Sequence, residues 1–223
     1  MLYVFGIIVG YLLGSVPFGL VLTRIAGRGD LRRVGSGNIG AANVMRVGGL
    51  RMAGLVWILD MAKAIAAVFI GNAIGGEAFG AMCGLAAVVG HCFPIWLRFH
   101  GGKGVSCLFG VLIAINPIIF LFCGIEWLIV ALSFGYSSLA GLVVFCVAPV
   151  FGFAVGFWVG VALSVISVIC IWRQGRRGQG CPQCRKQNDE GCGQNNAKKA
   201  CITQSFSFDT RRRQNGVIAT KHE

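Results

Sequence analysis

The chain consists mainly of long apolar runs, which alternate with a few short polar segments. Between residues 105 and 172 the only charged residue is Glu126. Apolar runs longer than about 18 residues are typical of transmembrane helices, because about 20 helical residues are needed to cross the hydrocarbon core. The pattern predicts an all-α, polytopic helical membrane protein.

Three spans are predicted before residue 104, at roughly residues 2–22, 52–73 and 78–97, each about 20 residues long. The first span contains the sequence GSVPFG at 14–19. A membrane helix tolerates such a break where neighbouring groups form hydrogen bonds with the backbone N–H and C=O groups that the break leaves without helical partners.

The chain carries a net charge of +12, and its basic residues indicate the side of the membrane on which each loop lies. The loop after the first span has one acid, Asp30, and six arginines: Arg24, Arg28, Arg32, Arg33, Arg46 and Arg51. Because loops rich in Lys and Arg stay in the cytoplasm, the N-terminus is expected outside. Arg98, Lys103 and the basic C-terminal tail are then expected inside.

The stretch 104–172 must therefore cross the membrane an even number of times. Two spans would be too long, whereas four would be short, at about 17 residues each. Four spans need turns at Asn116-Pro117, Gly135-Tyr136-Ser137 and Ala148-Pro149. Seven spans in total are expected; two long spans with a re-entrant segment are the alternative.

The sequence GSGNIGAANVMR at 35–46 has the composition of an anion-binding loop. Its glycines let the backbone approach a ligand closely, and successive N–H groups in such a loop form an anion-binding nest. Neutral side-chain donors and an arginine suit a phosphate group. The candidate residues are Gly35, Ser36, Gly37, Asn38, Gly40, Asn43 and Arg46. The alternative is a flexible basic loop that only reflects the topology rule.

The sequence HGGKG at 100–104 offers a similar set of groups: Gly101, Gly102, Lys103 and Gly104. It is not a nucleotide-binding Walker loop, because Leu97 stands at the first glycine position and Gly104 follows the lysine where Ser or Thr is required. A smaller phosphate ligand is expected.

Asp60 and Lys63 lie three residues apart inside the second span, so they can meet on one helix face. Charges within a membrane are costly and are usually paired or functional, which leaves a mutual ion pair and a direct substrate contact as two interpretations. His91 either packs through hydrogen bonds or acts in catalysis. The membrane body has no metal-ligand pattern and no His-x-x-x-x-Asp sequence, so no metal and no cofactor are expected.

Four segments occur in a characteristic order: GSVPFG (14–19), GSGNIGAANVMR (35–46), LDMAK (59–63) and GHCFPIWLRFHGGKGV (90–105). Together they resemble the acyl-phosphate:glycerol-3-phosphate acyltransferase (PlsY) family over residues 1 to about 173. The resemblance implies transfer of a fatty acyl group from acyl phosphate to the sn-1 hydroxyl of glycerol 3-phosphate, giving lysophosphatidate in bacterial phospholipid synthesis. It also implies a monomer in the bacterial inner membrane, cytoplasmic active-site loops and no nucleic-acid partner.

The resemblance further implies roles for individual residues. Ser36, Asn38, Arg46, Lys103 and His91 are expected to be catalytic. The expected substrate-binding residues are Gly35, Gly37, Gly40, Asn43, Gly101, Gly102, Gly104, Asp60 and Lys63. Because an acyl phosphate carries a good leaving group, neither a covalent intermediate nor a cofactor is required, and the substrate's own phosphate is a candidate proton acceptor.

The family's third motif, His-Arg-x-Asn-Ile-x-Arg-Leu, is missing after the last span, and Gln174 stands where its histidine belongs. We expect a membrane domain over 1–173 and a basic tail over 174–223. A disordered extension, a reading frame shifted near codon 174, and a small zinc site at Cys181, Cys184, Cys192 and Cys201 are three interpretations of the tail.

Two other functions stay open: an inactive homologue without the third motif, and a transporter for a phosphorylated solute. The absence of an internal repeat and the position of both polar segments on one face count against a transporter.

Overall fold

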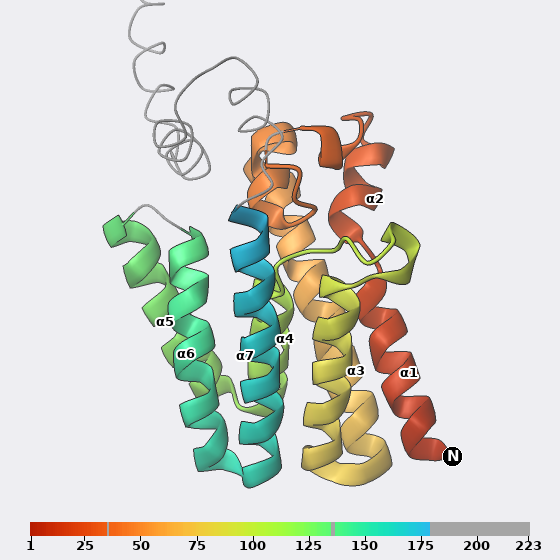
Figure 1. The fold of residues 1–223 in the computed structure, drawn as a ribbon, viewed down its shortest axis with the longest axis vertical. Coiled ribbons are helices and arrows are strands. Elements are labelled where there is room, and N and C mark those ends of the chain that lie inside the picture. Colours follow the sequence, from red (N-terminus) through yellow and green to blue (C-terminus); the bar gives the residue numbers. More distant parts are fainter. Residues whose placement is uncertain (35, 135–136, 179–223) are drawn as a thin grey trace, which may run out of the picture.

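The computed structural model describes residues 1–34, 36–134 and 137–178, with side chains described as far as Gly175. Within these ranges the chain is helical, without strands, which confirms the predicted all-α fold. The elements are α1 (Leu2–Ser15), α2 (Phe18–Ile25), η1 (Leu31–Arg33), α3 (Ala41–Cys92), η2 (Ile95–Leu97), α4 (Val105–Ile115), α5 (Pro117–Phe134), α6 (Ser137–Val155) and α7 (Phe157–Gly178). Figure 1 shows the longer helices running side by side as a bundle.

Helix α3 is a hairpin of two helical arms. Its backbone leaves helical values at Gly49 and at Gly75–Gly76, and Gly76 has a φ of 76°, a left-handed value that glycine adopts without steric cost. Figure 1 shows α3 reversing direction at the lower end of the bundle. The reversal lies between the predicted second and third spans, as expected.

Five helical stretches of the described chain are long and apolar enough to cross a membrane: Leu2–Ile25, Ala41–Leu97, Pro117–Phe134, Ser137–Val155 and Phe157–Gly175. The second of them contains the hairpin and so runs along the bundle twice, whereas α4 is shorter, with 11 residues. A polytopic membrane protein is therefore supported. The count of seven spans and the outside N-terminus stay predictions.

The chain breaks between α1 and α2 at Val16 and Pro17, inside the predicted break. Proline lacks a backbone N–H and pushes the preceding residue towards extended values, and Val16 accordingly has a φ of −65° and a ψ of 117°. At the break the carbonyl of Val16 accepts from the backbone N–H of Phe18 at 3.2 Å and from Nζ of Lys63 at 2.8 Å. A neighbouring side chain thus satisfies the interrupted backbone.

The predicted turn at Asn116-Pro117 is confirmed. Oδ1 of Asn116 accepts from the backbone N–H of Ile118 at 2.9 Å, and Pro117 takes the first position of α5, an arrangement that favours a helix start.

The predicted turn at Ala148-Pro149 is wrong, because α6 continues through Pro149 to Val155 and the chain turns at Gly156. A proline inside a membrane helix frees few backbone groups, and neighbouring helices can satisfy them. The turn predicted at 135–137 lies outside the described residues at 135 and 136; Ser137 begins α6.

Close helix packing aligns the elements that carry the polar loops. A Cβ at Gly14 of α1 would meet the backbone of Ala87, and a Cβ at Gly90 would meet the backbone of Tyr11. Small residues allow such close approach of membrane helices.

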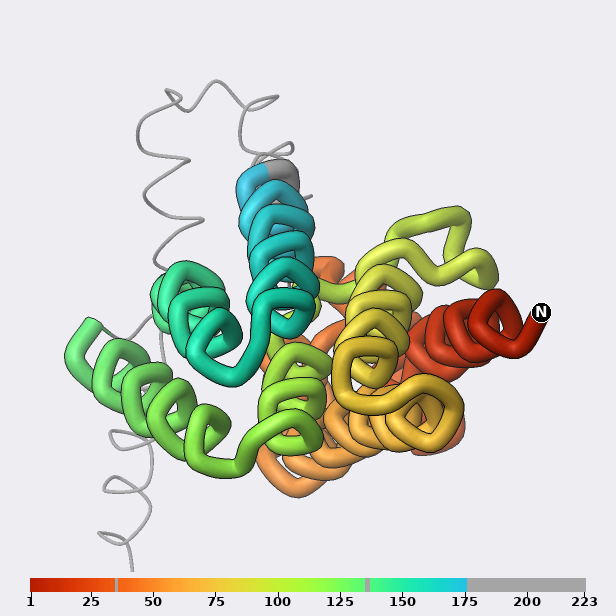
Figure 2. The backbone as a smooth tube through the Cα atoms, turned by 90° about the horizontal axis from the view of Figure 1, so that it is seen from below, coloured from red at the N-terminus to blue at the C-terminus, as the bar shows by residue number. Residues whose placement is uncertain are grey.

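In Figure 2, α7 lies between α6 and the second arm of α3. This packing brings the C-terminal end of α7 to the end of the bundle where both polar loops lie (Figure 1).

Candidate functional site

The two polar loops lie at the same end of the bundle. The loop over 26–40 follows α2, and the loop over 93–104 follows the second arm of α3; both are near the upper end in Figure 1, beside the end of α7. The prediction that the two loops share one side of the protein is confirmed. That this side faces the cytoplasm stays a prediction.

Asn43 holds the first loop in shape. Its side chain is buried, and Oδ1 accepts from the backbone N–H of Ser36 at 3.1 Å. Nδ2 donates to the carbonyls of Leu31 at 3.1 Å, Val34 at 3.0 Å and Asn38 at 2.9 Å. Both ends of the amide are thus used inside the loop, which makes Asn43 a positioning residue. Direct contact between Asn43 and a substrate stays a prediction.

The other predicted residues of this loop differ in exposure. Asn38 is buried, Ser36, Gly37 and Gly40 are half-buried, Arg46 on α3 is exposed, and Gly35 lies outside the described residues. Gly37 has a φ of 65°, a conformation that favours glycine. The loop therefore needs a glycine at 37 for its backbone, independently of any ligand.

Asp60, Lys63 and His91 form a buried polar cluster behind the second loop. Nζ of Lys63 lies 2.7 Å from Oδ1 of Asp60 and 3.1 Å from Nδ1 of His91, and that Nδ1 is 3.7 Å from the same carboxylate oxygen. The three side chains are at most 5% exposed. The predicted meeting of Asp60 and Lys63 on one helix face is confirmed. Direct contact of either residue with a substrate is untested by the geometry.

Lys63 connects this cluster to the break in the first span. An ammonium group has three donors, and its neighbours here are Asp60, His91 and the carbonyl of Val16. One potential metal-ligand atom from each of Asp60, His91 and Cys107 lies within 4.8 Å of the other two, close enough for all three to bind one metal ion. Because the Lys63 ammonium already places a positive charge beside them, we interpret the cluster as an ion-pair network.

His91 also supports the glycines of the second loop. The backbone N–H of Gly102 donates to the carbonyl of His91 at 2.9 Å, and that of Gly101 donates to the carbonyl of Cys92 at 3.1 Å. A Cβ at Gly102 would overlap the His91 imidazole, and a Cβ at Gly101 would overlap the His91 carbonyl. Gly104, just before α4, has a φ of 87°. Packing and backbone conformation therefore require these glycines.

Lys103 extends from the second loop towards α6. Its Nζ donates to Oγ of Ser138 at 2.6 Å, in the first turn of α6. Nothing in the sequence marks Ser138, because a single hydroxyl in an apolar helix is common. The site thus includes a residue that sequence reasoning missed.

The end of α7 packs against the second loop. Arg173 is buried, donates to the carbonyl of Phe99 at 3.1 Å and places its guanidinium 5.0 Å from the centre of the Phe93 ring. Gln174, at the position of the missing motif histidine, is buried as well. Helix α7 continues to Gly178, past the predicted domain boundary at 173. The tail is predicted over 174–223, and its three interpretations stay predictions, since residues from 179 onward lie outside the described residues.

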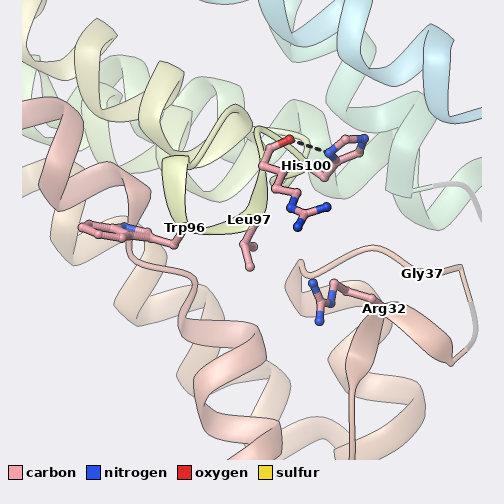
Figure 3. Close-up of a pocket in the computed structure, with 6 residues that line it drawn as sticks. Arg32, Gly37, Trp96, Leu97 and His100 are labelled. Atoms are coloured by element: carbon pink, nitrogen blue, oxygen red, sulfur yellow. Dashed lines mark hydrogen bonds between the residues drawn. The ribbon is translucent and has the colours of Figure 1, made fainter.

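An open pocket of about 410 Å³ lies between the two loops (Figure 3). Arg32 and Gly37 line it from the first loop, and Trp96, Leu97, Arg98 and His100 line it from the second. Of these six residues only Gly37 was predicted as part of the site. In the sequence, the topology rule alone accounts for Arg32 and Arg98, and no local pattern marks them as pocket residues.

Asp30 fixes one wall of this pocket. Its carboxylate lies 2.6 Å from the Arg32 guanidinium and 3.4 Å from that of Arg24. Hydrogen bonds from Arg32 hold the pKa of Asp30 well below its ordinary value of 3.8, and the same contact raises the pKa of Arg32. Both groups are therefore charged at neutral pH.

These features define a helical membrane protein with a basic, glycine-rich site at one end of its bundle. Over residues 4–177 the chain matches the family described as glycerol-3-phosphate acyltransferase. The chain belongs to this family, which confirms the resemblance stated above.

Individual relatives support the assignment. The chain is 46% identical over 166 residues to the glycerol-3-phosphate acyltransferase of Sinorhizobium medicae, covering 74% of this chain and 81% of that protein. It is 43% identical over 173 residues to that of Rhodopseudomonas palustris, covering 77% and 88%. The crystal structure of PlsY (YgiH), an integral membrane glycerol 3-phosphate acyltransferase, in its glycerol 3-phosphate form aligns with a TM-score of 0.74 and 34% identity, covering 85% of this chain and 93% of that chain.

Proposed function

We propose that this chain transfers a fatty acyl group from acyl phosphate to the sn-1 hydroxyl of glycerol 3-phosphate, and that it does so at the cytoplasmic face of the bacterial inner membrane. The hydroxyl oxygen attacks the carbonyl carbon, and the new ester is lysophosphatidate. The bond between the carbonyl carbon and the phosphate oxygen breaks, and inorganic phosphate leaves with the electron pair. The hydroxyl proton passes to a phosphate oxygen of the substrates.

The observation that carries the proposal is the meeting of two glycine-rich, basic segments at one end of a membrane bundle. Both substrates carry a phosphate group, so the site must hold two anions close together. Asp30 is the only acid in the loops 26–40 and 93–104, and its carboxylate is paired with arginines. The loops are thus suited to anionic ligands.

The chemistry requires positioning more than it requires a strong base. Holding two reactants in the right geometry can lower a barrier by about 7–11 kcal/mol, and fixed donors aimed at developing charge lower it further. We assign phosphate binding to Arg46 and Lys103, and orientation of the substrates to Ser36 and Asn38. The bond from Lys103 to Ser138 would fix the direction of the ammonium group.

The deciding experiment supplies the purified full-length protein with acyl phosphate and labelled glycerol 3-phosphate, and measures lysophosphatidate and its acyl position. Acyl-coenzyme A and acyl carrier protein serve as alternative donors. Lys103→Ala and Arg46→Ala should each lower kcat/KM by about 100-fold or more, whereas Arg51→Ala, an exposed arginine on α3, should not.

Each failure has its own meaning. Product formed equally from the other donors would contradict the acyl-phosphate assignment. Product formed only after Gln174→His would identify an inactive homologue. Flux of glycerol 3-phosphate into vesicles without acylation would favour the transporter.

A further inference from the structure

The pocket between the loops lies close to the end of α1. Nε1 of Trp96 donates to Oγ of Ser15, the last residue of α1, at 2.8 Å. This bond holds the indole against the helix, while 63% of the residue stays exposed. Tryptophan is enriched at the level of lipid headgroups, where its ring contacts the apolar region and its N–H finds a polar partner. The pocket therefore opens at the expected membrane interface.

The second loop carries both apolar and basic side chains along this opening. Its sequence from 95 to 100 is IWLRFH, and Ile95 and Phe99 are 52% and 55% exposed. Exposed apolar side chains next to basic ones are typical of segments that lie in the membrane interface, because the apolar groups enter the acyl region and the basic groups reach the phosphates. The loop has the chemistry of a lipid-facing surface.

The pocket walls carry two guanidinium groups. Arg32 is held by Asp30 through Nε and one terminal nitrogen. The Arg98 side chain lines the pocket and makes no hydrogen bond or ion pair with the part of the chain that the structure describes. Nδ1 of His100 donates to the Arg98 carbonyl at 2.6 Å (Figure 3), which leaves Nε2 of the ring for another contact. Planar guanidinium groups bind phosphate oxygens in pairs.

The backbone at this point is unusual. Arg98 and Phe99 have φ values of 50° and 62°, and consecutive left-handed residues other than glycine are uncommon. Such conformations concentrate at ligand sites, where the surrounding structure maintains them. Here they turn the chain just before the HGGKG sequence, and Arg98 is one of the residues that line the pocket.

We propose that this pocket binds the phosphate group of an anionic phospholipid from the surrounding leaflet. The arginines would contact the phosphate, the pocket volume would take the adjoining glycerol group, and the acyl chains would pass beside Trp96. Basic pockets at the cytoplasmic side of membrane helices are known to bind anionic headgroups. The pocket shares Gly37 with the predicted substrate-binding residues, whereas Arg46 and Lys103, to which we assign phosphate binding in the reaction, do not line it. The proposal can be tested separately from the acyltransferase reaction, because lipid binding is measured without turnover.

The test compares spin-labelled phosphatidylglycerol with spin-labelled phosphatidylcholine around the full-length protein in nanodiscs of unlabelled phosphatidylcholine. The wild type should prefer phosphatidylglycerol, and Arg32→Gln or Arg98→Gln should each lower the preference by about fivefold at low salt. Arg33→Gln is the matched control, since Arg33 neighbours Arg32 in η1, is exposed and does not line the pocket. Thermal unfolding establishes that each variant is folded.

Arg98→Lys keeps the charge but loses the planar fork, so its preference should lie between those of the wild type and Arg98→Gln. An unchanged preference in both glutamine variants would overturn the proposal, as would an equal loss in Arg33→Gln. Inorganic phosphate is added in a parallel series. If inorganic phosphate binds in a manner that Arg98→Gln abolishes while the wild type shows no preference for phosphatidylglycerol, the ligand is a free phosphate and the lipid proposal is wrong.

Discussion

The imidazole of His91 fills the space that a side chain at position 102 would need. The carbonyl of His91 also accepts the backbone N–H of Gly102 at 2.9 Å. Nδ1 of the same imidazole lies 3.1 Å from Nζ of Lys63. A single residue of α3 therefore connects the buried ion pair to the backbone of the second polar loop.

Replacement of Gly102 by alanine should destabilise the protein and lower its activity, because the new Cβ would push against the His91 ring. Combining Gly102→Ala with His91→Ala removes this overlap. The two substitutions together should therefore cost less than the sum of their separate costs, by about 0.5–3 kcal/mol. A double-mutant cycle on unfolding free energies measures this coupling without depending on turnover.

Gly101 provides the control for that cycle. A Cβ at position 101 would overlap the backbone carbonyl of His91, which no substitution at 91 removes. Gly101→Ala should thus show little coupling to His91→Ala, and equal coupling at both glycines would contradict the explanation.

The single variant His91→Ala also tests the predicted catalytic role, since a fall in kcat at unchanged stability would indicate a part in the chemistry.

Removal of one partner of the buried ion pair should be more harmful than removal of both. Lys63→Met leaves the Asp60 carboxylate buried without its cation and should cost about 3–5 kcal/mol of unfolding free energy. Asp60→Asn combined with Lys63→Met removes both charges and should recover a large part of that loss. If the double variant is as unstable as Lys63→Met, the carboxylate charge is not the cause.

The helical membrane fold and its polar end follow from the hydropathy and charge pattern, because the length of a span and the siting of basic loops depend on local composition. The break within residues 14–19 and the turn at Asn116-Pro117 are also predictable from local sequence, because proline interrupts the backbone hydrogen bonding of a helix. Pro149 was misread, because a proline that ends a helix in water can stay inside one where neighbouring helices and lipid exclude water.

The candidate site was only partly predictable. The pairing of Asp60 with Lys63 follows from their spacing along one helix, but His91 joins them because α3 reverses at Gly75–Gly76. Ser138 reaches Lys103 through the packing of α6, which no local pattern encodes. Asn43 was recognised as a candidate, yet its function as a hydrogen-bonding centre depends on the path of the whole loop.

Asn43→Asp should disorder the first loop although it preserves the size of the side chain. The aspartate oxygen can still accept from Ser36, but the donors to the three carbonyls are lost, and a carboxylate oxygen would face those carbonyls instead. We expect faster hydrogen exchange over 31–43 and a rise of about tenfold or more in KM for glycerol 3-phosphate, since an unsatisfied buried group costs about 1–3 kcal/mol. Unchanged exchange would contradict the positioning role.

The ion pairs of Asp30 should make a contribution to stability that depends on pH only under acidic conditions. Because hydrogen bonds from Arg32 lower the pKa of Asp30 below its ordinary value of 3.8, the folded state holds this proton less tightly than the unfolded state. The stabilisation is then complete above that value and is lost as the pH falls towards the folded pKa.

Asp30→Asn is a suitable reference for measuring this contribution, because its amide oxygen can still accept from the backbone N–H of Arg32. The difference in unfolding free energy between the wild type and Asp30→Asn should be small, about 1 kcal/mol or less for a pair with exposed arginines. It should stay constant between about pH 5 and 8 and shrink below pH 3.8. A difference that instead changes between pH 5 and 8 would mean that another group titrates with this pair.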